Sequence, residues 1–469
     1  MAGSGTRCSD APRKKHPMRR RTLLTTAAAG LTAASLAACG SGTPGQKAED
    51  SRAKSRTNVE FWGSVFTTPE NAWYKKVVED FNDAQEDVFV NYTVVPADAW
   101  DQKLKAAQAA GNAPDMYIKS GRLDTDARTG LLKPLDDLIE AKVFDEITDQ
   151  AKEVSQYQGK WFGFPLLLEP QVTLLWDKDL FEKAGLDPEK PPTTWHEMFQ
   201  ACEKIAPLLK NGQFCVGTAG DPDTFGWTTV AAQQHVAGHL PVSDDWSKAD
   251  AMDPKYEDLI GFYKTLQENK WMPRQPLGAG NSAQPLGEGK VAMLSQGSWA
   301  MSEIAADYPD KVKTTGMAPW VQNDGDLETS ISTIGNMKWL IDAKSKEPEA
   351  TATFFTWALG GDPEVLKPFF VDTQFTKAPA RQKVTDVVNK DPKSKDAPWS
   401  SVVFEDIVPF CVPESQYPFD INAALGDAIQ SGMTGEASPK DALKKANTEI
   451  QKVIDREDLA KAHKEMESK

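Results

Sequence analysis

The sequence predicts an α/β protein that folds into two lobes. Short apolar runs alternate along the chain with amphipathic helical patterns, as they do in folds whose strands and helices follow one another in turn. About 410 residues follow the N-terminal segments, which is more than a single hydrophobic core usually holds. We therefore expect an α/β fold with two lobes.

Strands and helices alternate in the first part of the folded region. The sequence predicts strands at 59–62, 88–95 and 115–118, and helices at 69–84 and 100–110. The first of these helices has one apolar stripe, made by Trp73, Val77, Val78 and Phe81. The second stops at Gly111, a residue type that favours the conformation adopted just after a helix.

Capping residues mark the later helices. Strands are expected at 160–168, 173–176 and 331–341, and helices at 194–209, 350–359 and 438–454. Thr194 and Glu197 form a capping box, in which each side chain bonds the backbone of the other residue. Ser438 and Pro439 supply the cap and the first turn of the last predicted helix.

The N-terminal residues have the pattern of an export signal. Three arginines, Arg19 to Arg21, precede an apolar run at 23–38 that is too short and too small in side-chain volume for a membrane span. The run ends in small residues and Cys39, which resembles the lipobox of a bacterial lipoprotein. We expect 1–38 to be a signal peptide and Cys39 to carry a lipid. An ordinary signal peptide is the alternative, and both Sec and twin-arginine export stay open.

Residues 39–57 have the composition of a flexible tether, rich in Gly, Ser and charged side chains without apolar periodicity. The formal net charge is −15, and 1–38 carry +6, so the mature chain is near −21. This acidity argues against nucleic-acid binding, which needs a basic surface. It also opposes binding to anionic headgroups, so the lipid must provide the anchor.

Cysteines and histidines give little sign of metal or catalytic chemistry. Outside the cytosol Cys202 and Cys215 could pair, but both could equally be small buried apolar residues. The sequence has no CxxC motif and no Cys/His cluster, so we expect no metal site and no cofactor. His235 and His239 are four residues apart but lack the HExxH pattern of zinc hydrolases. There is no Gly-x-Ser-x-Gly motif.

Several motifs occur in a familiar order over 58–469. They include GNAPDMYI, GLLKPLDDL, GKWFGFPLLLEPQVTLLWDKDLFEKAG and GEGKVAMLSQGSWAMSEI. In this order, behind a lipobox, they resemble the extracellular solute-binding proteins of ABC importers, in the large sugar-binding class related to maltose-binding protein.

The resemblance implies a periplasmic-binding-protein-like fold with several crossovers and a ligand cleft between the lobes. It places lobe one at 58–167 and 315–362, and lobe two at 168–314 and 363–469. It also implies a monomer that is not an enzyme, stands outside the cytoplasmic membrane and delivers a sugar or oligosaccharide to permease subunits. The chain has no ATP-binding motif, so the ATPases would be separate subunits.

A sugar presents apolar C–H faces to aromatic rings and hydroxyls to polar side chains. The chain has 14 tryptophans, of which Trp73, Trp339 and Trp357 lie in apolar periodic runs and are assigned to packing. The better ligand candidates lie at strand ends or in loops: Trp62, Ser64, Ser120, Arg122, Glu169, Gln171, Phe225, Trp227, Ser298, Trp299, Trp320, Asn336, Arg381 and Tyr417. Trp299 is the strongest, because the family's Gly-x-Trp segment stacks its ring on sugar.

Two alternatives stay open. The same fold can bind a peptide, a polyamine or a phosphorylated polyol, although the many tryptophans and the absence of a Lys/Arg cluster favour a neutral sugar. A lipid-anchored carbohydrate hydrolase is the alternative of another class, because 68 Asp and Glu residues leave room for a catalytic carboxylate pair. Turnover of the sugar on prolonged incubation separates a hydrolase from a binding protein.

Overall fold

The computed structural model describes residues 51–96, 99–218, 233–274, 277, 282–325, 332–415 and 417–467. Chain contacts separate Met1–Glu49 from one compact unit, Asp50–Lys469, to which all of these residues belong. The predicted signal peptide, Cys39 and the first part of the tether lie outside the described residues. Among the described residues, no helix is both long enough and apolar enough to cross a membrane.

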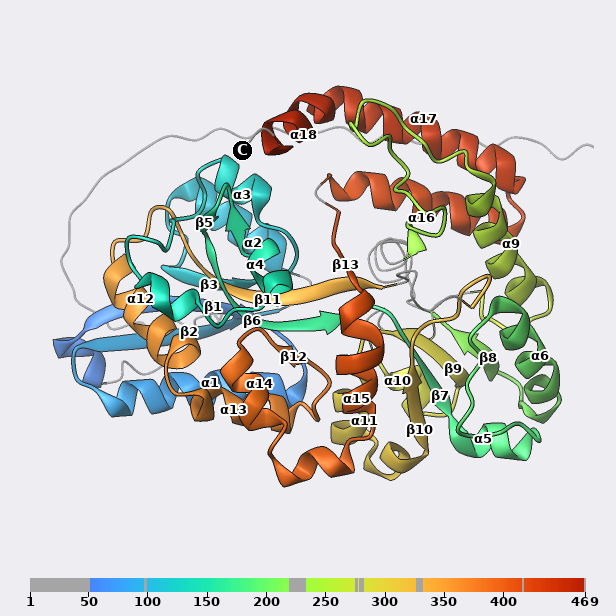
Figure 1. Cartoon of the computed structure of the whole chain (residues 1–469), viewed down its shortest axis with the longest axis horizontal. Helices are drawn as coiled ribbons and strands as arrows, with labels where there is room; N and C mark the ends of the chain where they lie inside the picture. The colour runs from blue at the N-terminus through green and yellow to red at the C-terminus, as the bar shows by residue number, and fades with distance from the viewer. Residues whose placement is uncertain are drawn as a thin grey trace, which may run out of the picture. The chain divides into compact units, whose positions relative to one another are not determined.

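The larger sheet has seven strands in the order β12-β6-β11-β3-β1-β2, with β13 paired to β11 (Figure 1). Its strands are β1 (Thr57–Ser64), β2 (Val88–Val95), β3 (Met116–Lys119), β6 (Gly163–Pro170), β11 (Thr333–Ile341), β12 (Ala378–Pro379) and β13 (Val412–Pro413). β1 runs parallel to β2 and β3, whereas β11 runs antiparallel to β3 and β6. The strands predicted at 59–62, 88–95, 115–118 and 331–341 are confirmed to within a few residues.

Helices cover both faces of this sheet because alternate side chains point to opposite sides. On one face Phe61 and Trp339 pack with α1 (Thr68–Ala84), α12 (Pro348–Phe355) and α13 (Pro363–Asp372). On the other face Tyr117 and Leu340 pack against Leu104 of α2 (Trp100–Ala110). The predicted stripe of α1 is confirmed, since Trp73, Val77, Val78 and Phe81 are all buried. Trp73, Trp339 and Trp357 all take part in this core.

The smaller sheet has four strands in the order β10-β7-β9-β8. They are β7 (Thr173–Asp177), β8 (Phe214–Gly217), β9 (Val291–Gln296) and β10 (Thr315–Ala318). One face packs against α6 (Trp195–Ile205) and α9 (Pro254–Glu268), and α16 (Phe419–Thr434) and α17 (Pro439–Glu457) join this second core. The other face, with α10 (Gln284–Gly287) and α11 (Ala300–Asp307), continues the core of the larger sheet.

The capping box of α6 is formed as predicted. Thr194 Oγ1 accepts a hydrogen bond from the Glu197 backbone at 3.0 Å, and Glu197 accepts from the backbone of Thr193 and Thr194. Of the two alternatives for the cysteines, the structure has the disulfide: Cys202 in α6 is bonded to Cys215 in β8, with 5.6 Å between their α-carbons.

Strand pairing shows which sheet the short strands join. β10 is hydrogen-bonded to β7, so 315–318 belong to the smaller sheet, whereas the resemblance placed 315–362 in lobe one. β12 pairs with β6, and α13 packs on the core of the larger sheet, whereas the resemblance placed 363–469 in lobe two. Periodicity could not reveal this, because a short strand has the same pattern in either sheet.

Smaller elements complete the described chain. The remaining helices are α3 (Asp124–Arg128), α4 (Asp149–Glu153), α5 (Lys178–Lys183), α14 (Gln382–Val388), α15 (Trp399–Ser401) and α18 (Leu459–Glu467). Short 3-10 turns lie at Ser51–Ser55, Ala141–Phe144, Ala206–Leu208, Pro309–Thr314, Pro392–Asp396 and Val408–Phe410, and π-helical turns at Thr356–Gly360 and Val402–Ile407. β4 (Gln156–Tyr157) and β5 (Lys160–Trp161) form a hairpin.

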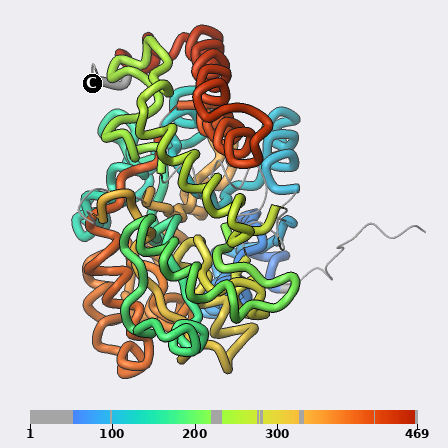
Figure 2. The backbone as a smooth tube through the Cα atoms, turned by 90° about the vertical axis from the view of Figure 1, so that its right-hand side faces the viewer, coloured from blue at the N-terminus to red at the C-terminus, as the bar shows by residue number. Residues whose placement is uncertain are grey.

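The C-terminal helices pack beside a segment that is distant in sequence. Figure 2 shows α17 and α18 running alongside the chain near residue 250. The Ala251 backbone donates a hydrogen bond to Asn447 Oδ1 at 2.9 Å, and the Ala249 backbone donates to Gln451 Oε1 at 2.9 Å. These bonds fix the segment that precedes α9.

Candidate functional site

Two cavities adjoin at the ends of β1, β3 and β6. The first has a volume of about 350 Å³, and we call it the Trp299 cavity; the second has about 590 Å³, and we call it the Tyr417 cavity. Val65, Phe66 and Met337 line both cavities, so they form the wall between them. The two cavities therefore lie next to each other, and each has a volume in the range of small-molecule sites.

Trp299 is placed by the turn after β9. The Ser298 backbone donates a hydrogen bond to the Pro170 carbonyl at 3.1 Å, and the Ser302 hydroxyl donates to the Trp299 carbonyl at 2.8 Å. These bonds tie the turn to the end of β6 and start α11. The indole is 9 % exposed, and this remaining surface lines the cavity. A flat apolar ring held in this way can stack on the C–H face of a sugar.

An ion cluster forms the wall of the Trp299 cavity on the side of the larger sheet. Lys377 Nζ lies 2.8 Å from Glu169 Oε2 and 3.7 Å from Glu70 Oε1. All three residues line the cavity, and Lys377 is fully buried. Burial raises the pKa of Glu169, although the Lys377 charge opposes this. Burial acts to lower the pKa of Lys377, but the two carboxylates outweigh it and the pKa is raised.

Glu70 has a structural role as well. Thr67 and Glu70 form the capping box of α1, in which Glu70 Oε2 accepts hydrogen bonds from the Thr67 backbone at 3.0 Å and from its hydroxyl at 2.5 Å. This bond network fixes the loop after β1, in which Val65 and Phe66 stand at the junction of the two cavities.

The Tyr417 cavity combines hydroxyl and amide groups with aromatic rings. Ser64, Ser120, Gln234, Ser415 and Tyr417 line it. Gln234 joins two of these groups: its Nε2 donates to Ser415 Oγ at 2.8 Å, and its Oε1 accepts from the Tyr417 hydroxyl. The rings of Trp100 and Phe419 also line this cavity, and Phe419 is 42 % exposed. Such a wall offers donors, acceptors and flat surfaces, as sugar binding requires.

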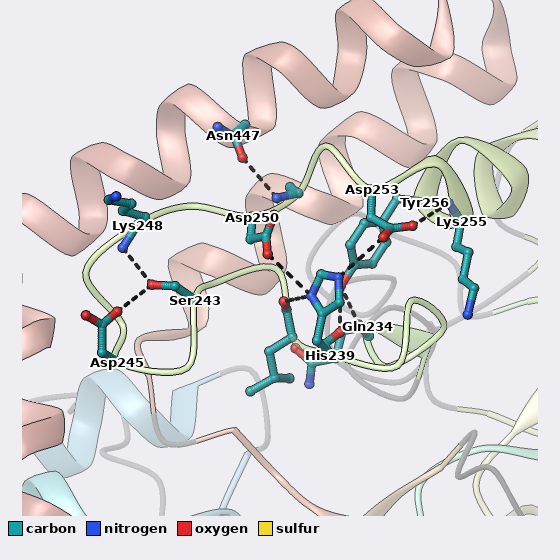
Figure 3. A network of polar contacts seen from close by, with 12 residues as sticks. Gln234, His239, Ser243, Asp245, Lys248, Asp250, Asp253, Lys255, Tyr256 and Asn447 are labelled. Atoms are coloured by element: carbon teal, nitrogen blue, oxygen red, sulfur yellow. Dashed lines mark hydrogen bonds and ion pairs between the residues drawn. The ribbon is translucent and has the colours of Figure 1, made fainter.

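The backbone of Gln234 is held by a network of polar contacts (Figure 3). The Tyr256 hydroxyl donates to the Gln234 carbonyl at 2.7 Å and to the His239 carbonyl at 3.0 Å. The His239 ring lies between Asp253, 3.5 Å from Nε2, and Asp250, 3.8 Å from Nδ1. Burial opposes a charged ring, but the carbonyl and the two carboxylates outweigh it, so the pKa of His239 is raised.

The structure brings five of the predicted ligand residues into the cavity walls. These are Ser64, Ser120, Glu169, Trp299 and Tyr417. Gln171 lies directly behind the wall, where it donates to Glu414 and accepts from Thr333. Asn336 and Ser298 are buried and line neither cavity, although Asn336 accepts from the buried Lys338. Burial lowers the pKa of Lys338 to about 7.

Four other candidates line neither cavity and have packing or ion-pair contacts in the structure. Trp320 is fully buried in the second core, and its ring reaches no described cavity wall. Arg381 is buried and bonded to the Leu359 and Gly361 carbonyls and to Glu146. Arg122 is paired with Asp124 at 2.8 Å. Trp62 packs beside α2 with Lys103 Nζ 4.6 Å from its ring. Phe225 and Trp227 lie outside the described residues.

Sequence reasoning missed several cavity residues. Lys377 and Phe66 carry no recognisable motif, and Glu70 was visible only as an acidic residue in the first turn of a helix. Phe419 follows a proline and belongs to no motif that the sequence analysis singled out. Position alone gave a signal for Val65 and Phe66, since they directly follow the strand end at which Ser64 was predicted.

The family model described as bacterial extracellular solute-binding protein matches residues 76–398. The maltotriose-binding protein of Pyrococcus abyssi is 25% identical over 302 residues, which cover 64% of this chain and 60% of that protein. The sn-glycerol-3-phosphate-binding periplasmic protein UgpB of Escherichia coli is 28% identical over 316 residues, 63% of this chain and 68% of that protein.

A solved structure shares the fold over most of both chains. It is an ABC transporter solute-binding protein from Thermotoga lettingae bound with α-D-tagatose. It is 23% identical, with a TM-score of 0.72, and the match covers 85% of this chain and 100% of that one. The predicted two-lobe α/β fold is therefore confirmed.

Proposed function

The chain belongs to the bacterial extracellular solute-binding protein family, and we propose that it captures a sugar or oligosaccharide and delivers it to the permease of an ABC importer. The observation that carries the proposal is the pair of adjoining cavities, whose walls combine the Trp299 ring with carboxylate and hydroxyl groups. A sugar fits this arrangement because it has an apolar face and a rim of hydroxyls.

The ligand contacts come from residues of both sheets. Ser64, Ser120 and Glu169 follow or end strands of the larger sheet, whereas Trp299 follows β9 of the smaller one. A ligand that touches both sides favours the conformation in which these walls are close together. The proposed delivery step follows, because a permease can then distinguish the loaded protein from the empty one. The protein acts as a monomer and performs no reaction on the sugar.

The remaining parts of the proposal concern the cell surface. Residues 1–38 direct export, Cys39 carries the lipid, and the tether holds the folded unit outside the cytoplasmic membrane. Two relatives are named for different ligands, maltotriose and sn-glycerol 3-phosphate. The cavity walls support the sugar, because the lysines that line them are each paired with a carboxylate.

A thermal-shift screen of residues 58–469 tests this function. The panel holds maltotriose, mannotriose, mannobiose and D-tagatose beside sn-glycerol 3-phosphate, spermidine and a tripeptide. A ligand that binds only the folded state raises the melting temperature by mass action. We expect a shift with one sugar and full recovery of that sugar by chromatography. A shift with the phosphate, spermidine or peptide alone contradicts sugar binding, and sugar that returns cleaved contradicts a pure binding role.

A further inference from the structure

We propose that Lys377 is a positioning residue of this site, which keeps Glu169 as a carboxylate directed into the Trp299 cavity. The wall then accepts hydrogen bonds from ligand hydroxyls and rejects ligands that bring a negative charge. The proposal rests on the proposed function for the identity of the ligand, but the role of Lys377 can be measured without one.

Strand register places the two side chains together. β12 pairs antiparallel with β6, so that Ala378 stands opposite Leu168 and Pro379 opposite Leu167. Continuing this register by one residue places Lys377 opposite Glu169. Side chains directly opposite in an antiparallel pair lie on the same face and within contact. The observed separation of 2.8 Å between Lys377 Nζ and Glu169 Oε2 agrees with this.

The ammonium group is shared by two carboxylates. Glu70, held by its capping box, lies 3.7 Å from Lys377 Nζ on the other side. Tyr74 and Tyr92 are also buried, and burial raises the pKa of both hydroxyls, so neither supplies a charge. Two further carboxylates line the same cavity: Glu303, which accepts from Ser282 Oγ at 2.6 Å, and the exposed Asp307. Lys377 is the single cation among the described residues that line this cavity.

Removing the Lys377 ammonium would leave only influences that disfavour the charged form of Glu169. Burial already raises its pKa, and the charge of Glu70 acts in the same direction. The Lys377 charge is the largest opposing influence. Without it, Glu169 would take up a proton closer to neutral pH and present a hydroxyl donor in place of a carboxylate oxygen. Lys377 therefore decides which hydrogen-bonding partner the ligand meets.

The charged groups that line the two cavities also determine which ligands are excluded. Six carboxylates line the two cavities: Glu70, Asp101, Glu169, Glu303, Asp307 and Glu414. The two lysines that line the cavities are each ion-paired, Lys119 with Asp126 and Lys377 with Glu169. The internal segments outside the described residues, 97–98, 219–232, 275–276, 278–281, 326–331 and 416, contain no Lys or Arg. A phosphate would therefore enter a field of its own sign.

The decisive experiment follows the Glu169 carboxyl directly by NMR. The folded unit is labelled with ¹³C at the glutamate carboxyl carbon, and Glu169→Gln identifies the Glu169 signal. We expect Lys377→Met to raise the apparent pKa of Glu169 by more than about one unit. We expect Glu70→Gln, which keeps an oxygen for the helix cap, to lower it. A Lys377→Met pKa within about 0.3 unit of the wild type overturns the proposal.

Glu70→Gln also provides a test of the cluster if the Lys377→Met variant does not fold. It changes the same cluster without removing the lysine, and its expected shift has the opposite sign. If Glu70→Gln raises the Glu169 pKa or leaves it unchanged, the cluster does not couple as proposed.

Ligand binding gives the second readout. In the wild type, maltotriose affinity should vary less than about twofold between pH 6 and 8, whereas in Lys377→Met it should fall at pH 6 by several-fold. The double variant Glu169→Gln/Lys377→Met should lose this pH dependence, because the titrating group is gone. A pH dependence that survives in the double variant overturns the proposed route through Glu169.

The two proposals fail in distinguishable ways. If no sugar binds, the proposed function fails while the NMR titration still decides the role of Lys377. If sn-glycerol 3-phosphate binds the wild type as tightly as maltotriose, the rejection of anions is overturned even where the titration behaves as expected.

Discussion

In the turn after β9 the Trp299 indole lies directly over Gly297. A β-carbon added at Gly297 would come within 2.0 Å of the ring carbon Cζ3 and 2.2 Å of Cη2, which no real structure tolerates. The Gly-x-Trp motif thus has a steric meaning, because the first residue must lack a side chain for the ring to reach its place. The ring is held by the backbone beneath it as well as by its own turn.

Gly297→Ala is expected to weaken sugar binding by displacing the Trp299 ring. The loss should be on the order of tenfold, about 1.4 kcal/mol, because the ring contributes buried area and stacking to the ligand. Titration calorimetry with the sugar found in the thermal-shift panel measures it. The matched control is Gly261→Ala, because a β-carbon there meets nothing within 4 Å and lies inside α9. An affinity equal to that of the control contradicts the stacking role.

The sequence predicted elements well wherever local signals determine them. The α6 capping box and the apolar stripe of α1 depend on residues three or four apart, and both are present. The strand ends at Ser64 and Ser120 were found for the same reason, since a polar residue after an apolar run marks the end of a strand.

The sequence did not predict which strands pair when they are far apart along the chain. Lys377 and Glu169 are in contact because β12 pairs with β6, and about 200 residues separate these two strands. No sequence pattern in either strand indicates which strand it pairs with. Trp320 and Arg381 line neither cavity, for a different reason. Each has the residue type of a sugar contact and follows a short apolar run, but the neighbouring elements cover them completely. Burial depends on the whole fold and not on local composition.

Arg381→Met should separate a packing role from a ligand role. The guanidinium is bonded to two backbone carbonyls, at 2.6 and 3.1 Å, and to Glu146 at 3.0 Å. Its loss leaves buried acceptors without a donor, so we expect the free energy of unfolding to fall by about 3–5 kcal/mol. Urea denaturation measures this. Sugar affinity measured below the unfolding transition should stay within about twofold of the wild type; a larger loss would return Arg381 to the binding site.

The disulfide between α6 and β8 should stabilise the smaller sheet. It closes a loop of 13 residues, and cross-links of this size typically contribute about 2–4 kcal/mol. We expect Cys202→Ala/Cys215→Ala to lower the melting temperature, and a reductant to lower that of the wild type but not that of the double variant. The control is Cys411→Ala, since Cys411 is buried and unpaired by any disulfide. Sensitivity to the reductant in the double variant would contradict this assignment.

His239 should make stability depend on pH. Its Nδ1 lies 2.7 Å from the Leu240 carbonyl, which can only accept, so this nitrogen carries a proton while Nε2 faces Asp253. Burial opposes the charge, but these groups and Asp250 raise the pKa of His239 in the folded state. A raised pKa means that the folded state holds the proton more tightly than the unfolded chain does. The extra stability is therefore fully present below the unfolded value of about 6.5 and is lost as pH rises through the folded value.

The measurement is the difference in unfolding free energy between the wild type and His239→Gln at two pH values. We expect the stability advantage of the wild type over His239→Gln to be larger at pH 5.5 than at pH 8.5. The two values should differ by less than about 1 kcal/mol, because the ring is partly exposed to solvent. His196→Gln is the control, since this histidine contacts Gln200 on the exposed side of α6. The Tyr256 hydroxyl bonds both the His239 and the Gln234 carbonyls, so a loosened His239 segment should also weaken the wall of the Tyr417 cavity. A His239→Gln variant with the pH dependence of the wild type would show that the two aspartates do not hold the charged ring.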